Sequence, residues 1–152
     1  MKKRHLAVLS LLAAVGLTAT AALPAEASNP TLHFSYAVPN SPGSDTGSNT
    51  SLNGEWVRVK NSSGSASYTL TKWTIRDKQS HVYTFGTFTL KPGASVTLYT
   101  GKGTNSSSKR YWGRTSYIWN NTGDEAYLKN SSGTTRDTCS WGSKANGVQV
   151  TC

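Results

Sequence analysis

Short runs of alternating apolar and polar residues recur along the chain and are separated by turn residues. The clearest runs are 32–38 (LHFSYAV), which stops before Pro39, 55–60 (EWVRVK) and 95–100 (SVTLYT). A two-residue period places successive side chains on opposite faces of a β-strand. No segment after residue 27 sustains the 3.6-residue period of an amphipathic helix. Short strands with frequent turn signals predict an all-β domain, an antiparallel sandwich or barrel.

Further strands are expected at 68–77, 81–86, 88–90, 125–129 and 134–141. Between the first two predicted strands, residues 39–54 form a long loop rich in Ser, Gly, Asn and Pro. Pro92-Gly93 fits the central positions of a type II turn. In the run 55–60, Trp56 is expected to share the outer face of the sheet with Arg58 and Lys60.

The segment 111–133 organises the predicted fold because it concentrates aromatic residues around one strand. It holds two of the five Trp and three of the seven Tyr residues. Turn-forming residues at 120–124 and 130–133 bracket the strand 125–129, and Asp124 is expected to cap the first of these turns. We therefore place this hairpin in the middle of the core, with the following core residues: Trp73, Phe85, Trp119 and Leu128.

The first 27 residues have the composition of an export signal. Lys2, Lys3 and Arg4 precede an apolar run at 6–23, and the small residues of 24–27 (PAEA) fit cleavage after Ala27. The alternative is a membrane anchor, because the run nearly reaches spanning length. The basic start and Ala-rich run look bacterial. We expect a secreted protein with no membrane span after cleavage, and a single domain at 28–152.

Removing that signal leaves the domain basic. The chain has 16 Lys plus Arg and 7 Asp plus Glu, and residues 1–27 contain three of the former and one of the latter. The remaining 13 basic and 6 acidic residues give a net charge of +7. A domain of this charge associates with polyanions in a salt-dependent manner.

Two cysteines remain in the exported part, Cys139 and Cys152. In an oxidising compartment such a pair predicts a disulfide, which would hold the C-terminal tail on a sheet. The spacing matches neither a C-x-x-C redox pair nor a zinc-ligand pattern.

Several segments together resemble the lamin-tail domain, the immunoglobulin-like domain of nuclear lamins that also occurs in exported bacterial proteins. The similar segments are 53–61 (NGEWVRVKN), 70–77 (LTKWTIRD), 83–85 (YTF), 90–96 (LKPGASV) with 100–101, and 118–128 (IWNNTGDEAYL). The resemblance covers roughly residues 31–141 and implies an immunoglobulin-like antiparallel β-sandwich. It also implies a domain that is not itself an enzyme, with nucleic-acid or protein partners. The tail that contains Cys152 lies beyond it.

Residues that could carry chemistry do not form a recognisable catalytic motif. The two remaining histidines, His33 and His81, are expected to be solvated or to lie on edge strands. Asp124 and Glu125 are adjacent, so a strand would direct them to opposite faces. Residues 100–104 (TGKGT) lack the order of a phosphate-binding loop. We therefore predict no enzyme, no cofactor and no metal; the alternative is a hydrolase, or an accessory domain of one, acting through loop carboxylates or a metal.

One weak metal hypothesis remains open. Asp45, Asn49, Asn53 and Glu55 offer oxygen atoms that calcium could use, although their spacing is not that of an EF-hand loop.

Basic and aromatic residues alternate at 102–114, which is the candidate binding site. The members of this set are Lys102, Lys109, Arg110, Tyr111, Trp112 and Arg114. Cations among aromatic rings suit an anionic polymer, through salt-dependent contacts and stacking. The alternative is that the rings belong to the core and the cations to a solvated rim. We expect a secreted, monomeric, non-catalytic binding or structural module, with nucleic acid, a cell-wall polymer or an extracellular protein as partner.

Overall fold

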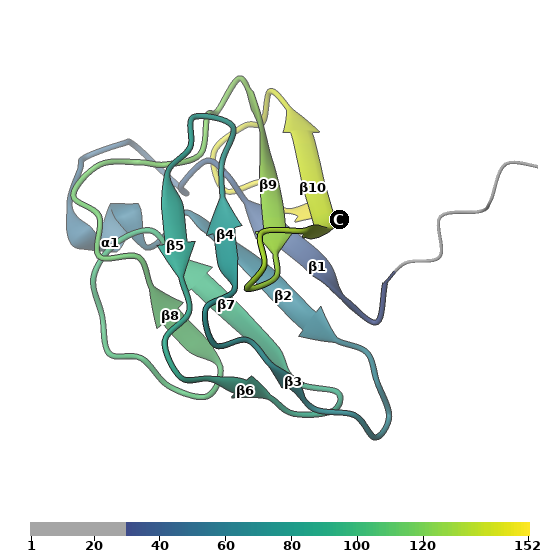
Figure 1. The fold of residues 1–152 in the computed structure, drawn as a ribbon. Helices are drawn as coiled ribbons and strands as arrows, with labels where there is room; N and C mark the ends of the chain where they lie inside the picture. The colour runs from purple at the N-terminus through teal and green to yellow at the C-terminus, as the bar shows by residue number, and fades with distance from the viewer. Residues whose placement is uncertain (1–29) are drawn as a thin grey trace, which may run out of the picture.

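Two β-sheets face each other in the part of the chain that the computed structural model describes, residues 30–152 (Figure 1). The five-stranded sheet has the order β11-β1-β2-β7-β8, the four-stranded sheet the order β10-β9-β4-β5, and β3 pairs with β6. The predicted immunoglobulin-like β-sandwich is thereby confirmed. The strands are β1 (Leu32–Val38), β2 (Trp56–Asn61), β3 (Tyr68–Thr69), β4 (Thr74–Arg76), β5 (Val82–Thr84), β6 (Thr89–Leu90), β7 (Ser95–Tyr99), β8 (Lys109–Tyr111), β9 (Gly123–Lys129), β10 (Thr135–Gly142) and β11 (Val150–Thr151).

The alternating strands bury one face each, as their sequences predict. Along β2, Val57 and Val59 are fully buried, whereas Trp56, Arg58 and Lys60 are only partly covered. Along β9, Ala126 and Leu128 are buried in the same way. Each large apolar side chain that is removed from water stabilises the fold by roughly 1.5–3 kcal/mol. The core therefore forms where the inner faces of the two sheets meet.

Aromatic rings occupy the centre of this core. Trp119 packs edge-to-face against Trp112, with ring centroids 5.8 Å apart, and against Trp141 at 5.5 Å. Of the four expected core residues, Phe85, Trp119 and Leu128 are buried, and Trp73 is partly buried at the margin of the cluster. Such T-shaped contacts add to the stabilisation that burial alone provides.

One strand pair departs from the expected antiparallel pattern. β8 runs parallel to β7, with Thr97 opposite Lys109 and Tyr99 opposite Tyr111. The loop between them carries the chain back to the start of β7 before β8 begins. The pairing continues past the strand ends, where the Trp112 N–H donates to the Tyr99 carbonyl at 2.8 Å.

The long loop after β1 contains a one-turn helix that the sequence pattern did not predict, α1 (Asn49–Leu52). The Ser48 hydroxyl accepts a hydrogen bond from the Ser51 N–H at 3.2 Å, which caps the helix. Leu52 is buried and anchors the turn to the domain. A single turn is too short to show helical periodicity.

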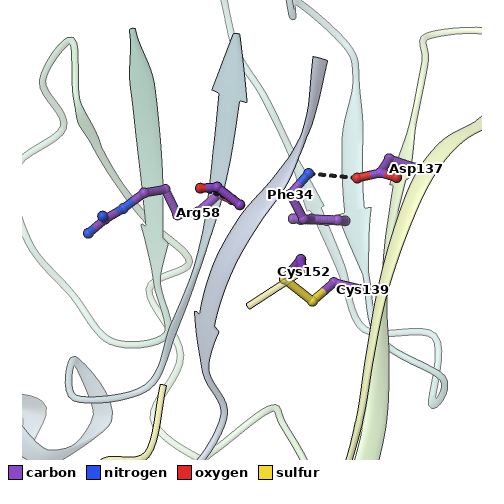
Figure 2. Close-up of a disulfide and its surroundings, with 6 residues drawn as sticks. Phe34, Arg58, Asp137, Cys139 and Cys152 are labelled. Carbon is purple, nitrogen blue, oxygen red and sulfur yellow. Dashed lines mark hydrogen bonds between the residues drawn. A yellow bond between two sulfur atoms is a disulfide. The ribbon is translucent and has the colours of Figure 1, made fainter. Parts of the chain in front are cut away.

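The disulfide Cys139–Cys152 is present, as predicted, and it joins the two sheets (Figure 2). Cys139 lies on β10 of the four-stranded sheet, whereas Cys152 follows β11, which pairs with β1 of the other sheet. The Cys152 N–H donates to the Ser35 carbonyl at 3.0 Å. Beside the disulfide, Asp137 Oδ2 accepts a hydrogen bond from the Phe34 N–H at 2.6 Å, where β1 has an irregular register (Figure 2). The tail therefore closes one side of the sandwich.

The predicted signal at 1–27 lies outside the described residues. Within residues 30–152, no helix is long and apolar enough to cross a membrane.

Candidate polyanion interface

The outer face of the five-stranded sheet carries an aromatic row that crosses three strands. Trp56 on β2 lies opposite Tyr99 on β7, and Tyr99 lies opposite Tyr111 on β8. The Tyr99 and Tyr111 rings are stacked, with centroids 5.3 Å apart and planes 21° from parallel. The Tyr111 ring lies directly against Gly103, where a Cβ atom would overlap it. We call Trp56, Tyr99 and Tyr111 the aromatic row.

A cationic row runs beside it, two residues later on β2 and two residues earlier on β7 and β8. Arg58 on β2 lies opposite Thr97 on β7, which lies opposite Lys109 on β8. Neighbouring strands are about 4.8 Å apart, so the Arg58 and Lys109 backbones are separated by about 10 Å. Both side chains are long enough to approach one anionic group between them. We call Arg58, Thr97 and Lys109 the cationic row.

Arg58 is held in place by uncharged neighbours. Its Nε–H donates to Thr97 Oγ1 at 3.1 Å, and its guanidinium carbon lies 4.8 Å from the centroid of the Trp56 ring. The side chain points away from the interior, on the side of the sheet opposite to Phe34 (Figure 2). A guanidinium over an indole is stabilised by the negative face of the ring. Its orientation on this face is therefore fixed without an ion pair.

The cationic row forms part of a shallow depression on this face. The lining residues are Arg58, Ser95, Thr97, Tyr99, Ser108 and Lys109. Thr97 is buried at the bottom of the depression and is neutral, whereas Lys109 is exposed at its edge and is charged.

Carboxylates are absent from this face because those in residues 30–152 are engaged elsewhere. None of them lies on β1, β2, β7, β8 or β11. Glu55, Asp77 and Asp124 are buried, and Asp137 accepts the hydrogen bond from Phe34 described above. Within residues 30–152 the only salt bridge joins His81 to Asp77 at 2.5 Å. The Lys and Arg charges of this part of the chain are therefore not neutralised by ion pairs.

Helix α1 fixes the backbone of the basic loop beside the aromatic row. Asn49 and Asn53 each donate a side-chain N–H to the Lys102 carbonyl, at 3.0 and 2.9 Å, and the Lys102 N–H donates to Asn49 Oδ1 at 2.7 Å. Gly101 is needed beneath this clamp, because a Cβ atom there would overlap both amide oxygens. The exposed Lys102 side chain is thus presented from a fixed backbone.

Glu55 fixes the segment that follows β8. Its Oε1 accepts a hydrogen bond from the Trp119 N–H at 2.6 Å, and its Oε2 accepts one from the Ile118 N–H at 3.2 Å. Burial is the main cause that raises the pKa of Glu55 to about 7, and the nearby Asp45 charge acts in the same direction. The hydrogen bonds from the Ile118 and Trp119 N–H groups oppose this rise. Backbone N–H groups, and no Lys or Arg side chain, are the hydrogen-bond partners of this carboxylate.

The six residues expected to bind a polyanion divide between two environments. Lys109 and Tyr111 lie on the outer face, and Lys102 is exposed in the adjoining loop. Arg110 points to the opposite side of β8, where its guanidinium carbon lies 4.0 Å from the centroid of the Phe88 ring.

The other two members of the set follow β8. Trp112 packs against Tyr83 and Trp119 at the margin of the core. Arg114 is half-buried, and its N–H donates to the Thr100 carbonyl at 2.9 Å. The structure therefore does not bring all six together on one surface.

Sequence reasoning missed the partners that the sheet supplies from other strands: Trp56, Arg58, Thr97 and Tyr99. The alternation in β2 did place Trp56 and Arg58 on an outer face. What it could not reveal was the register of β2, β7 and β8, which aligns them with Lys109 and Tyr111.

The four residues that could have bound calcium each have other contacts in the structure. Asn49 and Asn53 grip the Lys102 backbone, Glu55 holds the segment after β8, and Asp45 Oδ2 lies 3.5 Å from the Asn121 side-chain nitrogen. Within residues 30–152, no group of three or more His, Cys, Asp or Glu side chains is placed to hold a metal ion.

The histidines were expected to be solvated or to lie on edge strands, and His81 agrees with this, since its side chain is 38 % exposed and it precedes the edge strand β5. His33 is largely buried, with Nδ1 2.8 Å from the Pro30 carbonyl oxygen. His81 lies in the β4–β5 turn, where Asp77 accepts hydrogen bonds from its backbone N–H and faces its ring. Asp124 caps its turn as predicted, accepting from the Asn120 and Glu125 N–H groups at 3.1 and 2.8 Å. These carboxylates hold turns in place.

A second depression lies on the outer face of the four-stranded sheet. Its lining includes Arg76, Lys78 and Lys129, but also Asp77. The Tyr127 hydroxyl, also at this depression, donates to Glu125 Oε2 at 2.6 Å. Nearby carboxylates weaken the attraction for an anion, so the face of the five-stranded sheet is the better candidate.

The chain therefore has the fold of an immunoglobulin-like β-sandwich. The family model for the Lamin Tail Domain matches residues 25–143, so the chain belongs to the lamin tail domain family. Domains of this family are non-enzymatic and usually serve as binding or structural modules. The match ends before β11 and Cys152, which agrees with the expectation that the tail lies outside the family's domain. No curated protein matches the chain.

Proposed function

We propose that this protein is an exported, non-catalytic binding module that holds an acidic polymer on the outer face of its five-stranded sheet. The observation that carries the proposal is the alignment of the aromatic row with the cationic row on a face without carboxylates. Aromatic rings stack on an extended chain, and unpaired cations release counter-ions when they contact its charges. Nucleic acid and anionic cell-wall polymers both have the required charge.

Export is part of this proposal. It is supported by the composition of residues 1–27 and by the disulfide, because disulfides persist in oxidising compartments. Expression of the full sequence in a bacterial host is expected to yield secreted protein that begins at Ser28. The intact mass of the secreted protein checks this expectation, and a retained, uncleaved chain would contradict it.

Charge reversal on the cationic row tests the binding site. We expect Lys109→Glu to elute from immobilised single-stranded DNA or another polyanion at clearly lower salt than the unmodified protein. Arg136→Glu is the matched control, because Arg136 is an exposed residue of β10 on the other sheet and changes the net charge equally. Each lost phosphate contact reduces the slope of log affinity against log salt by about 0.7–0.9.

Equal shifts for Lys109→Glu and Arg136→Glu would show that net charge alone governs retention, and would count against this face. No retention of the unmodified protein on any polyanion would contradict the proposed function itself.

A further inference from the structure

The depression on the cationic row has more hydrogen-bond donors than a diffuse basic surface needs. Besides the two cations, it contains the hydroxyl groups of Ser95, Thr97 and Ser108. The Thr97 oxygen already accepts from Arg58 Nε, so its own proton remains available to a ligand. Hydroxyl protons and charged N–H groups therefore surround one small space.

Arg58 is oriented in advance for such a ligand. Within residues 30–152, its only side-chain hydrogen bond is the one from Nε to Thr97, which leaves the terminal Nη groups free. Its stacking on Trp56 fixes the plane of the guanidinium. A fixed guanidinium plane can present two parallel N–H groups to an oxyanion, at a lower entropic cost than a mobile lysine.

Lys109 completes the site from the opposite side. It extends from the edge strand β8, two strands away from Arg58 and on the same face, and is exposed. Its ammonium group acts as a point charge, whereas the guanidinium supplies direction. Together they place two positive charges on either side of Thr97.

This combination suits a tetrahedral oxyanion better than a carboxylate. A carboxylate offers two oxygens in one plane, which a single Arg fork can satisfy. A phosphodiester has two non-bridging oxygens that share one negative charge, and two bridging oxygens, in a tetrahedral arrangement. This arrangement matches donors that come from different directions, namely Thr97, Lys109 and Arg58. We propose that the depression lined by Arg58, Ser95, Thr97, Tyr99, Ser108 and Lys109 is a subsite for one phosphodiester group of a polymer.

The inference rests on the proposed function, because the shallow site is open and holds one group of a longer chain. The next part of the polymer would contact the neighbouring aromatic row, which lies two residues away along β2 and β7. Two residues of strand correspond to about 7 Å. The shared chemistry of a nucleic acid and of a polyol-phosphate wall polymer is the phosphodiester, and the experiment below separates these sources.

The test titrates residues 28–152 with polymers of matched charge at several salt concentrations. The probes are oligo(dT), poly(glycerol phosphate), dextran sulfate and polyglutamate. We expect the two phosphodiester polymers, and dextran sulfate with its tetrahedral sulfate groups, to bind more tightly than polyglutamate. The conservative variant Arg58→Lys keeps the charge but loses the paired N–H donors of the guanidinium. Phosphodiester affinity is therefore expected to fall about tenfold, while polyglutamate affinity stays nearly constant.

Arg136→Lys is the matched control and is expected to change nothing. Because Arg58 also contacts Trp56, urea unfolding must show that Arg58→Lys is folded. The double variant Ser95→Ala, Ser108→Ala provides an independent test, because it keeps both Arg58 and Lys109. We expect this double variant to lower phosphodiester affinity selectively as well. Loss of the preference in either folded variant supports the subsite.

Two results would overturn the subsite. They are equal affinity for polyglutamate and phosphodiesters, or no selective change in both Arg58→Lys and the serine double variant. In each of these cases the shift of Lys109→Glu on a polyanion column still tests the proposed function separately. If oligo(dT) binds more tightly than poly(glycerol phosphate), and Trp56→Ala removes this difference, the subsite is supported and the phosphodiester comes from nucleic acid. If the two polymers bind equally, the subsite is supported and the phosphodiester comes from a polymer without bases.

Discussion

Lys109 and Arg110 are neighbours in β8, yet the strand directs them to opposite faces. Lys109 lies on the outer face opposite Thr97, whereas Arg110 covers the buried Phe88 ring and donates to the Ser106 carbonyl. Identical charge and adjacent positions therefore give two different roles. For a basic cluster recognised in a sequence, strand alternation decides which members are available to a partner.

This difference predicts opposite effects for two similar substitutions. We expect Arg110→Gln to lower the free energy of unfolding by about 1 kcal/mol, through loss of the cation–π contact and the hydrogen bond, with little effect on salt elution. We expect Lys109→Gln to leave the free energy of unfolding nearly unchanged and to lower the salt concentration at which the protein elutes. Urea unfolding and polyanion chromatography on both variants check the prediction, which would fail if Arg110→Gln were the stronger binding defect.

At the scale of elements, Glu55 links the start of β2 to the segment between β8 and β9. The carboxylate is 1 % exposed and meets the Ile118 and Trp119 N–H groups. Since burial raises the pKa from 4.5 to about 7, the folded state binds a proton that the unfolded chain releases between these values. Its contribution to stability is therefore fully present below about pH 4.5 and is lost as the pH rises through about 7.

Substitution of this carboxyl should remove that pH dependence. As the pH rises from 5 to 8, we expect the urea midpoint of the unmodified protein to decrease relative to that of Glu55→Gln. The glutamine cannot titrate but retains one acceptor oxygen. Glu125→Gln is the control, because Glu125 is only partly buried and does not contact the segment that Glu55 holds. Parallel midpoint profiles for Glu55→Gln and the unmodified protein would disprove this account of Glu55.

For the whole molecule, the disulfide and the binding face lie at different sides of the five-stranded sheet. β11 pairs with β1 at one edge, and β8 forms the other edge. The disulfide connects the two sheets, so its removal should affect the sandwich more than the face. In the chain-entropy model a bridge of this span contributes roughly 3 kcal/mol.

Replacing both cysteines with serine is therefore expected to lower the free energy of unfolding by about 3 kcal/mol. Salt elution from a polyanion should stay the same at temperatures where the variant is folded. Thermal unfolding followed by chromatography measures both. Weakened retention in a folded double variant would mean that the tail takes part in binding.

Much of this architecture could be predicted because alternation and turn chemistry are local properties. The β2 sequence, 56–60, identified a strand and its outer residues, and the cysteine pair predicted the disulfide. The interface could be predicted only in part, since a row across strands depends on register. Lys109 and Tyr111 were found from the cluster of charge and rings, whereas Arg58 and Thr97 come from distant parts of the chain.

Helix α1 and the parallel strand β8 were missed for a related reason. The helix is one turn long and is held by Asn49 and Asn53 against Lys102, which is 49 residues from Asn53. The direction of β8 depends on where the loop 101–108 returns the chain, which alternation does not specify. In both cases a tertiary contact, not a local pattern, decides the structure.

Amide chemical shifts of the labelled protein, recorded during titration with oligo(dT) and with poly(glycerol phosphate), would show whether the outer face of the five-stranded sheet binds an acidic polymer. We predict salt-sensitive shifts concentrated at Trp56, Arg58, Thr97, Tyr99, Lys109 and Tyr111, with little change along β4 and β9. Shifts centred on Arg76 and Lys129, or no shifts with either polymer at low salt, would contradict binding at this face.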